Sequence, residues 1–488
     1  MLDDNAIATC RSRGLDGRAG RAEALPFPNE SFDVVTFDYV AHHVEHLAVL
    51  FWRIAHGSRD SAMTARSAFP PCASRRNIGT SEVIPIVSTI MTDVPKRSIR
   101  IILPLATITC TSMLAMDLYL PAVPTLQRAL NVSVTQSQGT IAVFLLGLAA
   151  SQLLWGEVLT RVGPRRCVRA GVGLLVLASI GCALAANIGV LSGMRLLQGI
   201  AAGVATVIAP SVVRATLSGS DAVRGIAAIS MVESVIPAAG PVLGATLLTY
   251  TDWRGLFWIL AVLTLAVFPF AVRATPHELP GMDRSVAAGY RNVLSNRKYR
   301  RLAVSHALTV GALLTFVASA PQLLVNALGL GASAFALLQI IGVSGFFLTA
   351  SQSARISGRL GPSRAVQLGA AAQLGLCGGL LVASLLTDLN FVLVAIFWCG
   401  FCAALAVRGP PGFSEALDVP IVQMGRASAM LVLGILLCGA AGTQLVAPFM
   451  SGSSATPVAG AVLLLSLLSF ALVIPYPRHD RAPAPISY

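Results

Sequence analysis

Three charged residues interrupt long apolar segments of this 488-residue chain: Asp117, Arg195 and Glu233. If these segments cross a membrane, each charge is costly, because a charged side chain at the bilayer centre costs about 2.5–3.5 kcal/mol on insertion scales. Such residues normally face an internal cavity, pair with one another or carry a proton. The chemistry that these residues indicate is therefore proton binding and charge recognition inside a membrane.

Asp117 and Arg195 are expected at similar depths. Asp117 lies seven residues before Pro124 and Arg195 lies seven residues after Ile188, so both lie about 10 Å from the ends of their helices on one side. We expect an ion pair or a water-bridged pair between them. In the alternative interpretation, Asp117 caps a helix end at the interface and Arg195 extends to the membrane surface.

The composition requires elements that cross a bilayer. Of all residues 55% are hydrophobic and 12% are charged, against about 25% charged in soluble proteins. A helix needs roughly 20 apolar residues to span the hydrocarbon core. The sequence therefore predicts an all-α membrane protein of twelve transmembrane helices in two six-helix halves, with spans near 99–120, 141–159, 170–186, 190–213, 226–250, 257–272, 302–325, 335–351, 366–386, 391–406, 427–450 and 458–474.

The net charge of +13 reflects topology. Lys and Arg residues are concentrated in alternate connections between the spans, which by the positive-inside rule places both termini and the 273–301 loop in the cytoplasm. This distribution argues against a nucleic-acid partner. The predicted domains are the N-terminal half 95–272, the central loop 273–301, the C-terminal half 302–476 and a cytoplasmic tail 477–488.

A basic glycine loop occurs twice. Gly156-Glu-Val-Leu-Thr-Arg-Val-Gly-Pro-Arg-Arg166 follows the second span, and Ser357-Gly-Arg-Leu-Gly-Pro-Ser-Arg364 follows the eighth. The repeat at corresponding places in the two halves indicates a duplicated membrane fold. The residues of the first copy that we single out are Gly156, Thr160, Arg161, Gly163, Arg165 and Arg166.

The fifth span has a face of small residues. Gly240 and Gly244 allow close approach of another helix, while Pro237 and Pro241 each remove a backbone hydrogen bond and permit bending. Glu233 lies seven residues before Gly240 and therefore on nearly the same face. We interpret Glu233 either as a second protonatable or cation-recognising site, or as a carboxylate paired with a loop arginine.

Residues 1–91 differ in composition from the rest of the chain. The segment 21–46, with AEALPF followed by FDVVT, resembles the middle of a class I S-adenosylmethionine-dependent methyltransferase. The strand and Gly-rich loop that this family needs for its cofactor do not precede it. We therefore expect 1–60 to be a methyltransferase remnant without a cofactor and 61–94 to be a linker.

Residues 95–476 resemble the major facilitator superfamily, and within it the drug:proton antiporters of the Bcr/CflA type. The run Met116–Pro124, with Asp117 and Tyr119, is similar to the MDxYLPAxP run of these exporters. The run Met194–Gly203 matches the RxxQGxxxG pattern of the family through Arg195 and Gln198. The fifth span carries the GPxxG core of the antiporter motif.

The first basic loop departs from the family pattern at Thr160, where the family has an Asp that is thought to brace the inner gate. Thr160 can donate a hydrogen bond but cannot form an ion pair. The expected inner gate is therefore looser, or it is closed by other contacts such as those of Glu157.

The resemblance implies proton-coupled efflux of amphipathic, phenicol-like or bicyclomycin-like drugs by a monomer in the bacterial inner membrane. Its partners would be a drug, a proton and the lipid bilayer, with no cofactor, metal ion or catalytic residue. Two alternatives are a symporter or facilitator on the same fold and a membrane-tethered methyltransferase. ATP hydrolysis is not expected, because the chain lacks a phosphate-binding loop of the Gly-x-x-x-x-Gly-Lys type.

Overall fold

The computed structural model describes residues 96–217, 219–278, 289–387, 389–450 and 454–474. Helices account for most of these residues, and the elements follow one another as α4 (Lys96–Asp117), η3 (Leu120–Ala122), α5 (Val123–Leu130), α6 (Val134–Val162), α7 (Pro164–Ala183), α8 (Ile188–Thr216), α9 (Gly219–Leu247), α10 (Trp253–Ala274), α11 (Gly289–Ser295), α12 (Arg297–Asn326), α13 (Ala332–Leu360), α14 (Pro362–Leu386), α15 (Phe391–Ala416), α16 (Ile421–Val446), η4 (Ala447–Phe449) and α17 (Thr456–Val473).

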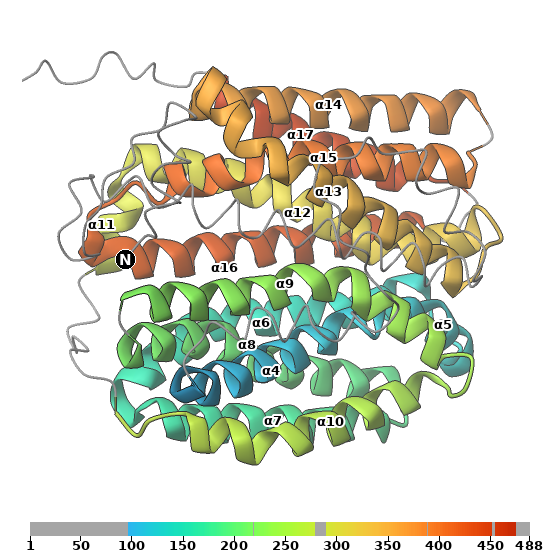
Figure 1. Cartoon of the computed structure of the whole chain (residues 1–488). Helices are drawn as coiled ribbons and strands as arrows, with labels where there is room; N and C mark the ends of the chain where they lie inside the picture. The colour runs from blue at the N-terminus through green and yellow to red at the C-terminus, as the bar shows by residue number, and fades with distance from the viewer. Residues whose placement is uncertain (1–95, 218, 279–288, 388, 451–453, 475–488) are drawn as a thin grey trace, which may run out of the picture.

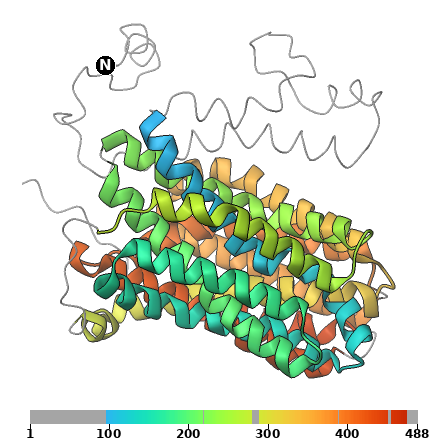
Figure 2. The same cartoon turned by 90° about the horizontal axis from the view of Figure 1, so that it is seen from below.

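The long helices run side by side in two groups. Figure 1 shows α4–α10 in the lower part of the molecule and α12–α17 in the upper part. Across this boundary α6 packs on α16 and α9 packs on α13. Figure 2 shows the same bundle turned by 90°, with its helices still roughly parallel.

The expected fold class is confirmed. Within the described residues, eleven helices are long and apolar enough to cross a membrane, and α9 adds a shorter apolar segment, Val235–Leu247. Backbone groups in lipid must be satisfied within the segment, and a helix does this. The expected span 391–406 was too short, because α15 continues to Ala416. The predictions for 1–94 and for 477–488 lie outside the described residues.

Helix ends follow from local sequence. Ser133 and Gln136 form a capping box at the start of α6, and Asn187 caps α8, as short polar side chains do for free N–H groups. At the opposite end of the bundle, α6 and α13 both terminate at a glycine with a left-handed φ, +83° at Gly163 and +82° at Gly361. We call this second end, where the two basic loops lie, the basic end.

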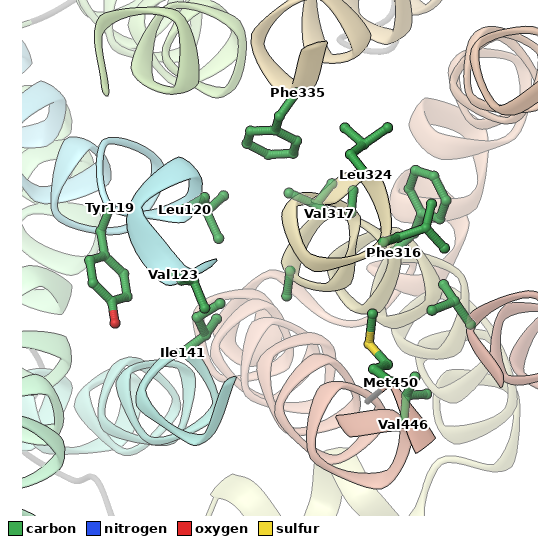
Figure 3. Close-up of a cluster of buried hydrophobic side chains, with 14 of the residues drawn as sticks. Tyr119, Leu120, Val123, Ile141, Phe316, Val317, Leu324, Phe335, Val446 and Met450 are labelled. Carbon is green, nitrogen blue, oxygen red and sulfur yellow. The ribbon is translucent and has the colours of Figure 1, made fainter. Parts of the chain in front are cut away.

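The other end of the bundle, which carries η3 and η4, we call the η3 end. Here one apolar cluster draws on both groups of helices. Tyr119, Leu120 and Val123 contribute to it from the first group, and Phe335 and Met450 contribute from the second. Figure 3 shows Leu120, Val123 and Phe335 pointing into the space between the two groups of helices, with Tyr119 on the other side of its helix.

Two polar contacts cross the boundary at the η3 end. Gln322 of α12 donates a hydrogen bond to Gln127 of α5. Gln138 of α6 donates to the sulfur of Met450 at 3.3 Å. The two groups of helices are therefore packed together at the η3 end.

Candidate functional site

Asp117 lies at the C-terminus of α4. The helix ends there because Pro121 has no N–H with which to bond the carbonyl of Asp117. The backbone then tightens: the N–H of Tyr119 donates to the carbonyl of Met116 at 3.2 Å. The side chain of Asp117 is thus held inside the bundle, with 9% of its surface exposed.

Arg195 of α8 caps this helix end. Because the Tyr119 N–H bonds to Met116, the carbonyl of Ala115 lacks its usual helical partner. Nη1 of Arg195 donates to that carbonyl at 2.7 Å and to Oε1 of Gln198 at 2.5 Å. A cation at a helix C-terminus is also favoured by the helix dipole. Arg195 therefore fixes the turn on which Asp117 lies.

Aromatic rings enclose the Arg195 guanidinium, which is fully buried. Its central carbon lies 4.2 Å from the ring centroid of Phe144, 4.6 Å from that of Tyr119 and 5.8 Å from that of Phe257. Ring faces attract cations at these distances. They take the place of hydrogen-bond partners for Nε and Nη2, which have none among the described residues.

Of the two expected arrangements, the direct ion pair between Asp117 and Arg195 is not formed, and the water-bridged pair stays a prediction. Both residues are described, and no ion pair or hydrogen bond joins their side chains. The guanidinium of Arg195 instead donates hydrogen bonds to the carbonyl of Ala115 and the amide oxygen of Gln198. The correspondence in depth was sound, since Arg195 contacts the same turn of α4, but its partner is the backbone.

Tyr119 and Gln198 extend this network. The hydroxyl of Tyr119 lies 2.7 Å from that of Thr140, and Nε2 of Gln198 donates to Ser179 at 2.8 Å. Both side chains are almost completely buried. They hold Arg195 and the end of α4 in place, and neither lines the cavity described next.

A cavity of about 390 Å³ lies between the two groups of helices. Its wall includes residues from α4, α6, α8 and α9 on one side and from α12, α13, α15 and α16 on the other. Most of these are apolar or aromatic, such as Phe144, Phe346 and Leu405. Among the described lining residues, Asp117 is the one with a charged side chain.

Polar atoms without partners also line this cavity. They include Oγ of Ser112, Oε1 of Gln339 and Nε1 of Trp398, which have no hydrogen-bond partner among the described residues. A buried polar group without a partner costs about 1–3 kcal/mol. These atoms can therefore bind the polar groups of a ligand or water. The sequence singled out none of the three, because Ser, Gln and Trp are unremarkable in a membrane span.

The glycines of the antiporter motif pack on the helix of Asp117. A Cβ built on Gly240 would lie 2.5 Å from the Cβ of Asp117, and one on Gly244 would collide with the carbonyl of Leu118. Pro237 lines the cavity, and its carbonyl accepts a hydrogen bond from Gln339 at 3.5 Å. Pro241 lies between the glycines in α9. The motif thus places α9 against the end of α4.

Glu233 lies on α9, half-buried and outside the cavity lining. Gly225 lies beside Ile102 and Gly240 lies beside Asp117, so α4 and α9 run parallel in constant register. Glu233 is then about 10 Å from the level of Asp117 toward the basic end. No ion pair joins it to any arginine whose side chain is described, and pairing with an arginine of the 279–288 loop lies outside the described residues, so both interpretations stay open.

The first basic loop is organised by its own helix. Oγ1 of Thr160 donates to the carbonyl of Glu157 at 2.8 Å, and Glu157 pairs with Arg161 at 2.6 Å. Both contacts lie within α6, so Glu157 does not replace the family aspartate across a helix boundary here. The pair is largely exposed, and such pairs contribute about 0–1 kcal/mol.

The rest of this loop contacts the segment after α10. Arg165 lies 2.9 Å from a ring nitrogen of His277. Gly163 adopts its left-handed φ of +83° where a side chain would meet the carbonyl of His277 at 2.5 Å. Arg166 is exposed, and a side chain at Gly156 would meet open space. The loop therefore contains one tight contact, at Gly163, and several solvent-facing charges.

A second buried arginine, Arg408 of α15, was not expected. Its Nη2 donates to Oγ of Ser305 at 2.6 Å and to Oγ of Ser469 at 2.8 Å, and its Nη1 reaches Gln373 at 3.4 Å. Only 2% of Arg408 is exposed. The sequence offered one signal: Arg408 lies only two residues beyond the predicted span 391–406. The helix of that span continues past it.

Two packed groups of helices around a shared cavity define a multi-pass membrane transporter. The chain belongs to the Major Facilitator Superfamily, which residues 105–421 match. Multidrug resistance protein MdtL of Escherichia coli O81 is 26% identical over 362 residues, which cover 73% of this chain and 90% of the relative. The protein of that name from Shigella dysenteriae serotype 1 matches equally well. The predicted superfamily is confirmed.

Solved structures agree in fold. A D-xylose-proton symporter has a TM-score of 0.58 at 16% identity, with 75% of this chain and 96% of that chain covered. A bacterial homologue of the human lysosomal transporter Spinster, in an inward-facing and unoccupied conformation, has a TM-score of 0.59 at 15% identity, with 78% and 94% covered. At these identities the likeness shows the fold alone.

The N-terminal resemblance is also found. Residues 2–56 match a methyltransferase domain, the segment in which the sequence predicted a methyltransferase remnant. The match ends well before α4 begins at Lys96. The chain as a whole is a transporter, because the Major Facilitator Superfamily match covers most of its length.

Proposed function

We propose that this protein exports amphipathic drugs in exchange for protons, with Asp117 as the proton-carrying group. One observation carries the proposal: Asp117 is the one charged side chain among the described residues that line the cavity between the two groups of helices. No described cation neutralises it. A carboxylate so placed takes up a proton or the polar part of a ligand.

In this proposal Arg195 positions Asp117 without pairing with it. Its bonds to Ala115 and Gln198 fix the last turn of α4, and its charge raises the local potential beside the carboxylate. In alternating access, the cavity then opens first toward one end of the bundle and afterwards toward the other end. The packed η3 end corresponds to the state in which the cavity is closed at that end. The cluster around Leu120 and Phe335 forms the gate that closes it.

Glu233 is proposed as a second protonatable group or a cation-recognising group. It lies on the α9 face that carries Gly240, about 10 Å nearer the basic end than Asp117. Ser112 lies between these levels on α4, and its hydroxyl has no partner among the described residues. Ser112 and water could therefore link the two carboxylates.

The substrate class and orientation are part of the same proposal. The relatives are called multidrug resistance proteins, and the apolar cavity suits amphipathic compounds, with phenicols and bicyclomycin-like drugs as the first to test. We place the protein in the bacterial inner membrane as a monomer, with the basic end and both termini in the cytoplasm, because Arg161, Arg165 and Arg359 gather there.

Drug accumulation in a bacterial host that lacks its main exporters tests the proposal. Cells with the wild-type protein should accumulate less phenicol than cells with Asp117→Asn, and a protonophore should abolish the difference. Proton-driven uptake by the wild-type protein would instead favour a symporter, the alternative on this fold. Equal accumulation with both proteins would reject Asp117 as the coupling residue.

A further inference from the structure

A second hollow lies on the side of the bundle at the η3 end. It has a volume of about 590 Å³, and its walls come from α6 and the start of α8 on one side and from α16 on the other. None of its lining residues belongs to the wall of the central cavity. We call it the α6–α16 groove. Its identification is independent of the proposed transport chemistry.

Small side chains create the groove. Gly139 and Ala142 line it from α6, and Ala440 and Ala441 line it from α16. A Cβ built on Gly139 would still lie 3.5 Å from Oε1 of Gln444, which is an ordinary contact. A space therefore remains beside Gly139 between the two helices.

The groove opens sideways. Leu146 of α6 is 42% exposed and Leu437 of α16 is 43% exposed, although both lie well inside spans long enough to cross a bilayer. At this depth the surroundings of a multi-pass membrane protein are acyl chains. The groove is therefore accessible from the bilayer.

Polarity changes along the length of the groove. Thr135, Gln136 and Gln444 line it near the helix ends, and Val143, Leu146 and Leu437 line it deeper. From Thr135 to Leu146 the rise along α6 is about 16 Å. One leaflet of the hydrocarbon core is about 15 Å thick, half of roughly 30 Å. Length and polarity thus match a phospholipid whose head lies at the η3 end.

We infer that the α6–α16 groove binds one phospholipid, with an acyl chain along Val143 and Leu437. Apolar contact alone does not favour the groove over bulk lipid, because lipid tails are as apolar as leucine; packing and hydrogen bonds do. Oε1 of Gln136 accepts from the N–H of Ser133 at 3.0 Å, which leaves its amide nitrogen to donate to an ester or phosphate oxygen. The amide of Gln444 offers a second donor.

Occupancy of the α6–α16 groove would affect the transport cycle because of the helices that form its walls. The facing walls belong to α6 and α16, which form an extensive contact between the two groups of helices. Separation of the η3 ends would widen the groove and reduce its contacts with an acyl chain. A bound phospholipid therefore stabilises the packed η3 end.

Native mass spectrometry of the full chain tests the inference, after extraction in mild detergent from vesicles of phosphatidylethanolamine and phosphatidylglycerol. The wild-type protein should retain one phospholipid. Ala441→Trp, which fills the groove, should reduce that occupancy at least tenfold, whereas Leu445→Trp, on the same helix, 73% exposed and outside the groove, should not. Gln444→Leu should weaken retention without filling the space and serves if Ala441→Trp does not fold.

Three results would overturn it. The wild-type protein could carry no phospholipid, or Ala441→Trp and Leu445→Trp could retain equal amounts. The third contradicting result is that Ala441→Trp reduces the binding of a radiolabelled phenicol and leaves the retention of phospholipid unchanged. The groove would then be a drug entrance.

Discussion

Gly240 of α9 lies directly against Asp117 of α4, so close that a Cβ on the glycine would stand 2.5 Å from the Cβ of the aspartate. The antiporter motif and the one charged group of the described cavity lining are therefore in contact. Movement of α9 changes the surroundings of the carboxylate at once, which is how a gate and a proton site can be coupled.

Gly240→Ala should abolish most drug export while the protein remains in the membrane. The added methyl group would lie 2.5 Å from the Cβ of Asp117, and overpacking of this kind costs about 1–3 kcal/mol. Gly375→Ala is the matched control, because a Cβ at that helical glycine has nothing within 4 Å. Resistance in a susceptible host measures both variants. Wild-type resistance with Gly240→Ala would mean that the contact has no role in transport.

Arg195→Ala should inactivate transport, because it leaves the carbonyl of Ala115 and the amide of Gln198 without their donor. Each unsatisfied buried group costs about 1–3 kcal/mol. Arg408→Ala should lower thermal stability less, because Ser305 and Ser469 lose a donor but remain hydrogen-bonded to each other, and it should retain proton-coupled export. Equal loss of export per folded molecule in both variants would show that Arg195 is only structural.

Glu233→Gln should weaken export of cationic drugs and spare neutral phenicols if Glu233 recognises cations. The control Glu157→Gln removes an exposed carboxylate that pairs within α6 and should change neither. Export from inverted vesicles, measured for both drug classes, separates the roles. Equal loss of both classes with Glu233→Gln would identify a coupling or structural residue.

The membrane potential gives a second test of charge. One proton exchanged for one neutral drug draws about 2.3 kcal/mol from 100 mV, enough for a drug gradient of roughly fifty-fold at about 1.4 kcal/mol per factor of ten. A monovalent cation exchanged for one proton moves no net charge. Collapse of the potential should therefore reduce phenicol export and leave export of a monovalent cation unchanged.

Deletion of residues 1–91, with translation from a start codon at or near Met91, should leave membrane insertion and transport intact. The superfamily match begins at residue 105, and α4 begins at Lys96. Loss of insertion in the shortened protein would show that the methyltransferase-like segment contributes to biogenesis.

The sequence predicted the fold because membrane-spanning helices are recognisable as long apolar segments. Apolar runs of about 20 residues gave the helices, and the repeat of Gly163 at Gly361 gave the duplication, which the structure expresses as φ values of +83° and +82°. What it did not predict was how far some helices extend beyond their spans: α13 continues to Leu360 and α15 to Ala416. The expected span ended at 406, just before Arg408, whereas buried serines on two other helices allow Arg408 to continue the helix inside the bundle.

The sequence named some of the residues that the structure places around the cavity, such as Asp117, but it did not predict their contacts. Spacing placed Arg195 at the right turn of α4, but a carbonyl freed by a 3-10 turn is invisible in sequence, and that carbonyl is its partner. Ser112 and Gln339 were missed for a related reason. Their unpartnered atoms become significant only when helices from both groups enclose one cavity.

Proton release from proteoliposomes loaded with a pH-sensitive dye tests the central claim most directly. Addition of a phenicol to vesicles containing the wild-type protein should evoke proton movement, because drug and proton exchange at Asp117. With Asp117→Asn, which keeps the size of the side chain but cannot lose a proton, drug binding should persist and the proton signal should vanish. A proton signal of wild-type size with Asp117→Asn would contradict the account.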